Sequence, residues 1–90
     1  SLVTLQDSIC VSQGVYFCTG NHDFKNINFN LICKPITIDS ECWIGSKVII
    51  GPGNIIGKGS VVKMGSIVTQ KIPPHSLVSG TKTINNYFLK

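Results

Sequence analysis

The sequence predicts an all-β protein, a solenoid in which short parallel strands are wound into stacked coils. Three observations lead to this fold. An aliphatic residue recurs every six positions, glycines recur at two fixed places within that repeat, and hydrophobic residues make up 42% of the 90-residue chain against 13% charged residues. Such a composition is typical of a folded chain, and a period of six fits neither a helix nor a simple strand alternation.

The repeat is clearest in the second half of the chain. Its aliphatic positions are Ile38, Ile44, Ile50, Ile56, Val62 and Val68. Glycine directly follows this position at Gly45, Gly51 and Gly57, and it lies three residues after the position at Gly53, Gly59 and Gly65, where its freedom at positive φ suits a tight turn. Each unit is therefore predicted to be a short strand followed by a turn. Three units close a triangular coil, and stacked coils turn the aliphatic positions inward as a ladder.

The residue just before each aliphatic position should point outward, because side chains alternate along a strand. These outward residues are also apolar: Trp43, Ile49, Ile55, Val61 and Ile67. Apolar residues on every outer face indicate surfaces that are covered in an assembly. The alternative is that they reflect only the β-propensity of exposed strands.

The repeat slips by half a unit between Phe17 and Ile38, which lie 21 residues apart, or three and a half repeats. Part of this stretch must leave the coil. We expect one domain with a first coil at 1–18, an extruded loop at 19–35, main coils at 36–80 and a C-terminal tail at 81–90. The repeat is already running by Leu5, so we also expect that an N-terminal portion of the protein precedes this sequence.

The net charge of +4 comes from eight lysines spread singly and no arginine. This pattern indicates a solvated surface rather than a nucleic-acid interface. No apolar run is long enough to span a bilayer, and no leader pattern opens the sequence, so we expect a cytoplasmic protein without membrane insertion. Four cysteines without a C-x-x-C pair are expected to be reduced, small hydrophobic residues.

The predicted loop carries a candidate catalytic group in the stretch GNHD. An imidazole has an unperturbed pKa of about 6.5, which suits proton abstraction near neutral pH. His22 is therefore a candidate base, and Asp23 or a backbone carbonyl could hold the tautomer of its ring. An ordinary surface histidine is the alternative, and the residues alone leave both open.

The run FCTGNHDFKNINFNLICKPITIDSECWIGSKVIIGPGNIIGKGSVV resembles the T-G-x-H-D segment, variable loop and W-I-G coil of the hexapeptide-repeat sugar O-acetyltransferases. The resemblance covers residues 3–80 and is greatest to the colanic-acid-biosynthesis acetyltransferase branch, with maltose and galactoside acetyltransferases as relatives. It implies a left-handed parallel β-helix, acetyl-CoA as donor and a sugar hydroxyl as acceptor in surface-polysaccharide biosynthesis. It also implies a homotrimer with active sites between subunits.

The resemblance also implies roles for individual residues. His22 would be the general base beside Asp23, and Trp43 would lie near the acceptor and cofactor cleft. The positions expected along coenzyme A and its phosphates are Ser46, Met64, Thr69, Gln70, Lys71 and Lys82. Three of the departures from the family pattern concern this cofactor. Gln70 stands where lysine is common, Met64 replaces a small alanine, and a common arginine is absent, with Lys82 as a possible substitute.

No metal site is expected, because the two histidines are not placed to form a three-histidine zinc site, and His75 is interpreted as a surface turn after a double proline. A second class of function stays open. The chain could be a catalytically silent β-helix that acts as a binding or assembly module. The intact T-G-x-H-D motif favours the enzyme, whereas the changed residues at the phosphate end favour the module.

Overall fold

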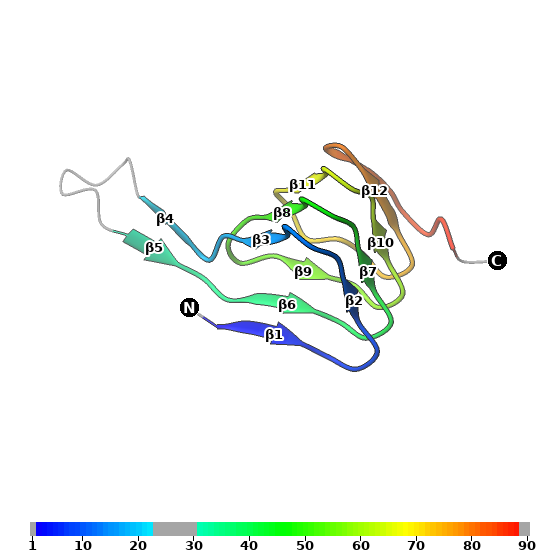
Figure 1. Cartoon of the computed structure of the whole chain (residues 1–90), viewed down its shortest axis with the longest axis horizontal. Helices are drawn as coiled ribbons and strands as arrows, with labels where there is room; N and C mark the ends of the chain where they lie inside the picture. Colours follow the sequence, from blue (N-terminus) through cyan, green and yellow to red (C-terminus); the bar gives the residue numbers. More distant parts are fainter. Residues whose placement is uncertain (1, 23–30, 89–90) are drawn as a thin grey trace.

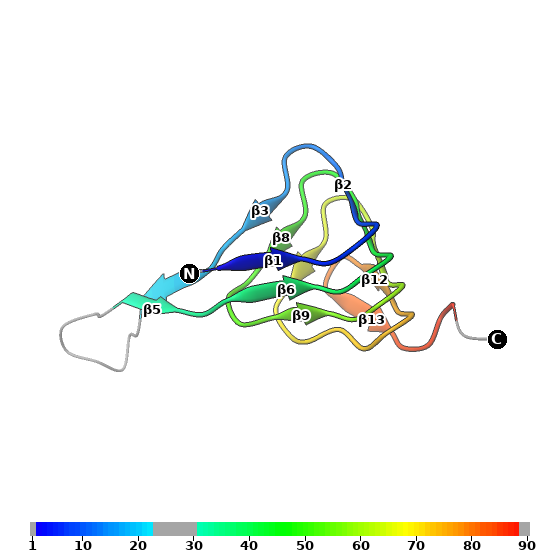
Figure 2. The same cartoon turned by 90° about the horizontal axis from the view of Figure 1, so that it is seen from below.

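The structure, a computed structural model, describes residues 2–22 and 31–88. Three parallel sheets form the sides of a triangular prism, and the chain passes from one side to the next as it climbs the stack (Figures 1 and 2). Side chains alternate between the two faces of each strand, so one of every two points into the prism. The aliphatic position of the six-residue repeat is the one that points inward, and these positions together form the core.

Each sheet collects one strand from successive coils. Sheet A contains β1 (Val3–Leu5), β6 (Ile36–Ile38) and β9 (Ile55–Ile56). Sheet B contains β2 (Cys10–Val11), β7 (Trp43–Ile44), β10 (Val61–Val62), β12 (Leu77–Ser79) and β13 (Lys82–Ile84). Sheet C contains β3 (Tyr16–Phe17), β8 (Ile49–Ile50) and β11 (Ile67–Val68).

The predicted aliphatic ladder forms the core. Ile38 pairs with Ile56, Ile44 with Val62 and Ile50 with Val68, and all six side chains are at most 1% exposed. Burying an aliphatic side chain of this size stabilises a fold by about 1.5–3 kcal/mol. At the first coil the ladder is less well covered. Leu5 keeps the register by pairing with Ile38, yet it is 49% exposed because β1 lies at the end of its sheet.

Small polar side chains fill the corners of the prism and join one coil to the next. The Ser60 hydroxyl accepts the Ser76 N–H at 3.0 Å and donates to the Pro73 carbonyl at 3.0 Å. The Ser66 hydroxyl accepts the Gly80 N–H at 3.0 Å. Both hydroxyls are fully buried. These bonds satisfy polar groups that would otherwise be costly to bury.

The interruption of the repeat is an antiparallel hairpin. Leu5 pairs with Ile38, 33 positions later, whereas Ile38 pairs with Ile56, only 18 positions later. The first turn of the solenoid is therefore 15 residues longer than the second. The insertion contains β4 (Gly20–His22) and β5 (Leu31–Cys33), which pair with each other and with no parallel sheet. Figure 2 shows this hairpin projecting from the corner where sheets A and C meet, on the side away from sheet B.

The C-terminal end of the solenoid reverses direction. The last coil is shorter, since Val62 pairs with Val78 only 16 positions later. After Ser79 the chain turns back, and β13 runs antiparallel to β12. The Phe88 N–H then bonds to the His75 carbonyl at 3.0 Å and ties the tail to the last coil. Sheet B therefore ends on an antiparallel strand.

Candidate functional site

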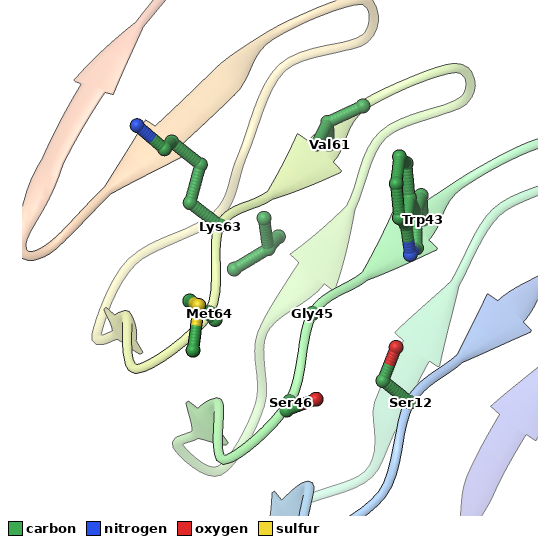
Figure 3. A pocket seen from close by; sticks show the side chains of 8 residues that line it. Ser12, Trp43, Gly45, Ser46, Val61, Lys63 and Met64 are labelled. Atoms are coloured by element: carbon green, nitrogen blue, oxygen red, sulfur yellow. The ribbon is translucent and has the colours of Figure 1, made fainter.

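A pocket of about 320 Å³ opens on the outer face of sheet B, where β7 and β10 end (Figure 3). This volume is at the lower end of the range for small-molecule sites, about 300–1,000 Å³. Three successive coils supply its lining, which consists of Ser12, Trp43, Gly45, Ser46, Val61, Val62, Lys63 and Met64.

The strand register explains why residues so far apart in sequence share this pocket. Val11 and Val62 both pair with Ile44, so the residues that follow these three strands also lie side by side. The Ser12 N–H donates to the Ile44 carbonyl at 2.9 Å, and the Gly45 N–H donates to the Val62 carbonyl at 2.8 Å. The floor of the pocket is thus fixed by the backbone ladder.

Gly45 sets how closely the walls approach. A Cβ atom at this position would stand 2.6 Å from the Met64 backbone nitrogen, closer than real Cβ contacts allow. Glycine therefore lets the turn that carries Met64 pack directly over the end of β7. The pocket exists in this form because one of its residues has no side chain.

The lining joins a flat aromatic ring with a few polar groups. Trp43 is 56% exposed and Met64 is 75% exposed, and Figure 3 shows their side chains on two sides of the pocket. Ser12 and Ser46 lie along a further edge of the pocket, and Lys63 carries its ammonium away from Trp43 (Figure 3). This lining suits a ligand with an apolar or amide-containing arm and polar substituents.

The structure brings three of the predicted site residues together, namely Trp43, Ser46 and Met64. Four others are exposed and do not line the pocket: Thr69, Gln70, Lys71 and Lys82. Sequence reasoning assigned no site role to Ser12 or Lys63. For Lys63 a signal existed in the repeat, because glycine directly follows the aliphatic position in the three preceding units and lysine follows it after Val62. For Ser12 the only signal was its position one residue after the inward-facing Val11.

The predicted base lies on the hairpin. His22 is the last residue of β4, and its backbone pairs with Leu31 of β5. Asp23 lies outside the described residues. The catalytic roles of His22 and Asp23 therefore stay predictions that rest on the sequence motif.

His75 occupies a turn, as expected, although it is half-buried rather than fully exposed. Its φ of 58° is in the left-handed region, and its ring lies over Gly59, where an added Cβ would stand 2.6 Å from Nδ1. Within residues 2–22 and 31–88, no cluster of three or more His, Cys, Asp or Glu side chains could hold a metal ion. No helix in this part of the chain is long and apolar enough to cross a membrane.

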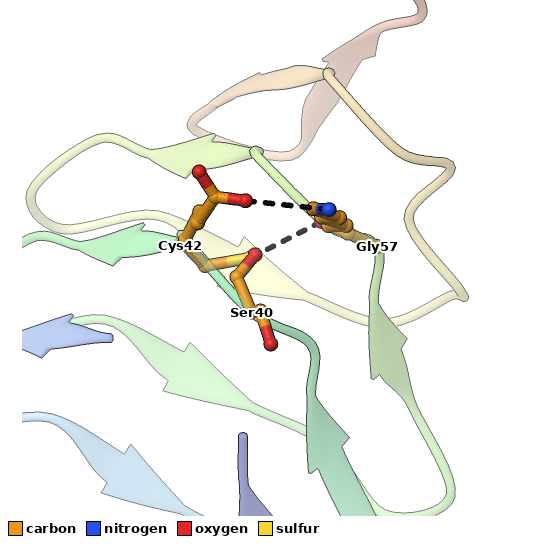
Figure 4. A network of polar contacts seen from close by, with 5 residues as sticks. Ser40, Cys42 and Gly57 are labelled. Atoms are coloured by element: carbon orange, nitrogen blue, oxygen red, sulfur yellow. Dashed lines mark hydrogen bonds and ion pairs between the residues drawn. The ribbon is translucent and has the colours of Figure 1, made fainter. Parts of the chain in front are cut away.

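Cys42 illustrates the structural use of cysteine in this fold. Its side chain is 2% exposed, and the thiol donates to the Gly57 carbonyl at 3.1 Å (Figure 4). Burial raises the pKa of the Cys42 thiol, which keeps it protonated and unreactive. This cysteine is a small core residue, as the sequence predicts.

The outer faces of the prism are apolar. Of the residues predicted to point outward, Trp43, Ile49, Ile55 and Ile67 are 39–56% exposed, and Val61 is half-buried. Tyr16, on the outer face of sheet C, is 61% exposed. Large apolar side chains therefore lie at the surface of all three sheets of a single chain.

No protein-family model matches the chain. Over 46 residues it is 35% identical to the putative colanic acid biosynthesis acetyltransferase WcaF of Escherichia coli, and it matches the same protein of Shigella flexneri to the same extent. The match covers 51% of this chain and 25% of the relative. The chain thus spans about a quarter of the length of the curated relatives it matches.

Among solved structures, a hexapeptide-repeat acetyltransferase of Vibrio cholerae in complex with acetyl coenzyme A matches 91% of this chain and 46% of its own, with 36% identity and a TM-score of 0.83. A galactoside acetyltransferase in complex with coenzyme A matches 83% of this chain and 39% of its own, with 37% identity and a TM-score of 0.77. A maltose O-acetyltransferase of Clostridium difficile matches 93% of this chain and 57% of its own, with 25% identity and a TM-score of 0.72. These matches confirm the predicted fold, a left-handed parallel β-helix.

Proposed function

We propose that this chain, which is similar to solved hexapeptide-repeat and galactoside acetyltransferases, transfers an acetyl group from acetyl-CoA to a sugar hydroxyl. The observation that carries the proposal is the pocket on sheet B. Trp43, Ser46 and Met64, which the sequence motif assigns to the donor and acceptor cleft, line it together. The similarity to the colanic acid biosynthesis acetyltransferase supports a role in surface-polysaccharide biosynthesis. A cytoplasmic location is proposed from the sequence pattern alone.

The donor is proposed to lie with its thioester arm in the pocket. The amides of that arm can bond to the Ser46 hydroxyl, while Trp43 and Met64 supply apolar contact. In this proposal Lys82, an exposed residue on β13 of sheet B, lies farther along the cofactor. Thr69, Gln70 and Lys71 follow β11 of sheet C and precede Ile72, which bridges to sheet A, so they do not lie along this pocket.

The chemical step would be a direct transfer. His22 accepts the proton of the sugar hydroxyl, with Asp23 orienting the ring, and the sugar oxygen attacks the thioester carbonyl carbon. The carbon–sulfur bond then breaks, and coenzyme A leaves as a thiolate that takes the proton from the imidazolium. A backbone N–H near the carbonyl would stabilise the oxyanion, which is a common source of large rate effects.

The position of the hairpin supports a site shared between subunits. The β4–β5 hairpin projects from the corner between sheets A and C (Figure 2), whereas the residues that line the pocket belong to sheet B and the turns that follow its strands. His22 is therefore proposed to serve the pocket of a neighbouring subunit in a homotrimer. The apolar outer faces of the prism, with Trp43, Ile49 and Ile67 exposed, are consistent with such an assembly.

Titration of the chain with coenzyme A by calorimetry tests the donor, and release of free thiol from acetyl-CoA in the presence of sugar acceptors tests the reaction. Binding together with acceptor-dependent thiol release is the expected result. Binding without any thiol release would favour the alternative, a catalytically silent binding or assembly module. That alternative draws support from Gln70, which replaces a residue that is commonly lysine.

A further inference from the structure

Charge is divided unequally between the two halves of the chain. Residues 42–90 contain six lysines and no aspartate or glutamate, which gives them a net charge of +6. Residues 1–41 contain two lysines and four carboxylates, a net charge of −2, so the two parts together give the +4 of the whole chain. Charge asymmetry of this kind is typical of chains that bind an anionic surface.

The solenoid converts this asymmetry into a difference between its two ends. The carboxylate side chains of the described residues are Asp7, Asp39 and Glu41, and all lie on the first two coils, near the end formed by β1, β2 and β3. At the other end the sheets finish with Ile72, β11 and β13. Because no carboxylate side chain follows Glu41 in the sequence, this C-terminal end of the prism carries cations and no anionic side chains.

Apolar side chains are exposed at the same end. Ile84 of β13, Tyr87 and Phe88 are 40–56% exposed, and we call these three residues the terminal patch. The rings of Tyr87 and Phe88 meet edge to face with their centroids 4.9 Å apart. The Phe88 N–H bonds to the His75 carbonyl at 3.0 Å. The tail is therefore held against the last coil while its apolar side chains stay at the surface.

A lysine lies on the same coil as the anchor of the terminal patch. Lys71 is exposed and directly precedes Ile72, which bridges to Ile56 at the end of sheet A. His75 follows Lys71 by four residues, so their backbones are at most roughly 14 Å apart. Figures 1 and 2 both show the tail leaving the prism on the side opposite the β4–β5 hairpin. A large partner can therefore meet the terminal patch without touching the hairpin.

We propose that the C-terminal end of the solenoid docks on the surface of a membrane that contains anionic lipids. The side chains of the terminal patch enter the headgroup region, and Lys71 lies against the lipid phosphates. Exposed aromatic and aliphatic side chains favour this interface, and a lysine close to an anionic membrane typically raises affinity about fivefold. A lipid surface fits better than a nucleic acid, because the chain has no arginine and Ile84 offers no ring for base stacking.

Apolar contact and positive charge are both needed, since stable attachment to a membrane usually takes two signals. In the proposed homotrimer with its solenoids side by side, three C-terminal ends would face the same way and bind together, which raises avidity without any new contact. Docking uses neither the pocket nor His22, so the inference does not depend on the proposed transfer reaction.

The charge is tested by co-sedimentation with vesicles of phosphatidylcholine or of an equal mixture with phosphatidylglycerol, without coenzyme A or acceptor. The parent should bind the mixed vesicles only, and 1 M salt, where the Debye length is about 3 Å, should weaken binding. Lys71→Gln should lower the affinity about fivefold. Lys34→Gln is the matched control, because it removes the same charge from an exposed position after β5, beside the hairpin, and should bind like the parent.

The terminal patch is tested with Tyr87→Ser, which should lower the affinity for mixed vesicles by about fivefold to tenfold. Tyr87→Phe keeps the ring and should bind like the parent. Both variants should keep the parent's unfolding midpoint and its mass by light scattering, because Tyr87 is exposed on the tail.

Four results would overturn the proposal. The first is a parent that binds neither kind of vesicle, or both equally. The second is an equal loss in Lys34→Gln and Lys71→Gln, which would mean that only net charge matters. The third is a fall in mass for Tyr87→Ser, which would assign the terminal patch to contacts between copies. The fourth is tighter binding to single-stranded RNA than to mixed vesicles, which would make the partner a nucleic acid.

Discussion

Gly45 and Met64 lie so close together that a methyl group on Gly45 would stand 2.6 Å from the Met64 backbone nitrogen. Gly45→Ala must therefore push apart two turns that form the pocket. Overpacking of this kind typically costs about 1–3 kcal/mol. We expect a loss of this size in the free energy of unfolding, measured with denaturant, and weaker coenzyme A binding in calorimetry.

Gly51→Ala is the matched control for that change. An added Cβ at Gly51 would meet the Val68 carbonyl at 3.3 Å, a contact that small shifts can relieve. Its cost should be smaller than that of Gly45→Ala, and coenzyme A binding should be kept. Equal effects of the two substitutions would mean that the close approach at Met64 has no special importance for the pocket.

Ser66→Ala should destabilise the C-terminal end of the solenoid. The Ser66 hydroxyl is buried and accepts the Gly80 N–H at 3.0 Å, and its loss leaves that N–H without this partner. Gly80 is exposed, so the expected loss is the net contribution of one hydrogen bond, about 0.5–1.5 kcal/mol, which a denaturant titration measures. Thr81→Ala, at an exposed neighbouring position, should change stability by less than about 0.5 kcal/mol.

Met64→Ala tests where the donor lies. The side chain is 75% exposed and stands at the pocket wall, so its removal widens the groove at little cost to the core. Coenzyme A affinity should be equal to or higher than that of the parent. Abolished binding, with an unchanged unfolding midpoint, would mean that the groove has been assigned to the wrong place.

His22→Ala should abolish most of the turnover while the fold and coenzyme A affinity remain. Loss of a positioned general base typically lowers a rate by about 10² to 10⁴. That range corresponds to roughly 2.7–5.5 kcal/mol of transition-state stabilisation. Acceptor-dependent thiol release is the measurement, and an unchanged rate would remove His22 from the mechanism. His75→Asn, which tolerates the left-handed φ of 58°, should keep the parent rate.

Light scattering should give the mass of three chains of 9.7 kDa each. The physical reason is the exposed apolar surface, which includes Tyr16 at 61% and Ile67 at 42% exposure. A monomeric mass at the concentration used for the activity assay would contradict the trimer. It would also remove the basis for placing His22 in a neighbouring subunit's pocket.

The sequence alone was sufficient to predict the buried core, and its repeat also breaks phase after Phe17. Both depend on local rules, because a residue's inward or outward direction follows from alternation along its strand and from the six-residue repeat. Ile38, Ile44 and Ile50 are fully buried as predicted, and the half-unit slip after Phe17 corresponds to the β4–β5 hairpin. Trp43, Ser46 and Met64 were expected at a site because the resemblance to hexapeptide-repeat sugar O-acetyltransferases implies those roles, not because the repeat itself does.

Tertiary structure decided which residues share a surface. Ser12, Gly45 and Lys63 meet because coils stack with offsets of 33 and 18 positions, and the first offset depends on the length of the hairpin. Sheet B extends to Lys82 only because β13 turns back against β12, and nothing in the repeat predicts that reversal. The exposure of Leu5 likewise follows from its place at the end of the stack. The repeat determines whether each side chain points inward or outward. Which side chains lie next to it depends on how many residues separate one coil from the next.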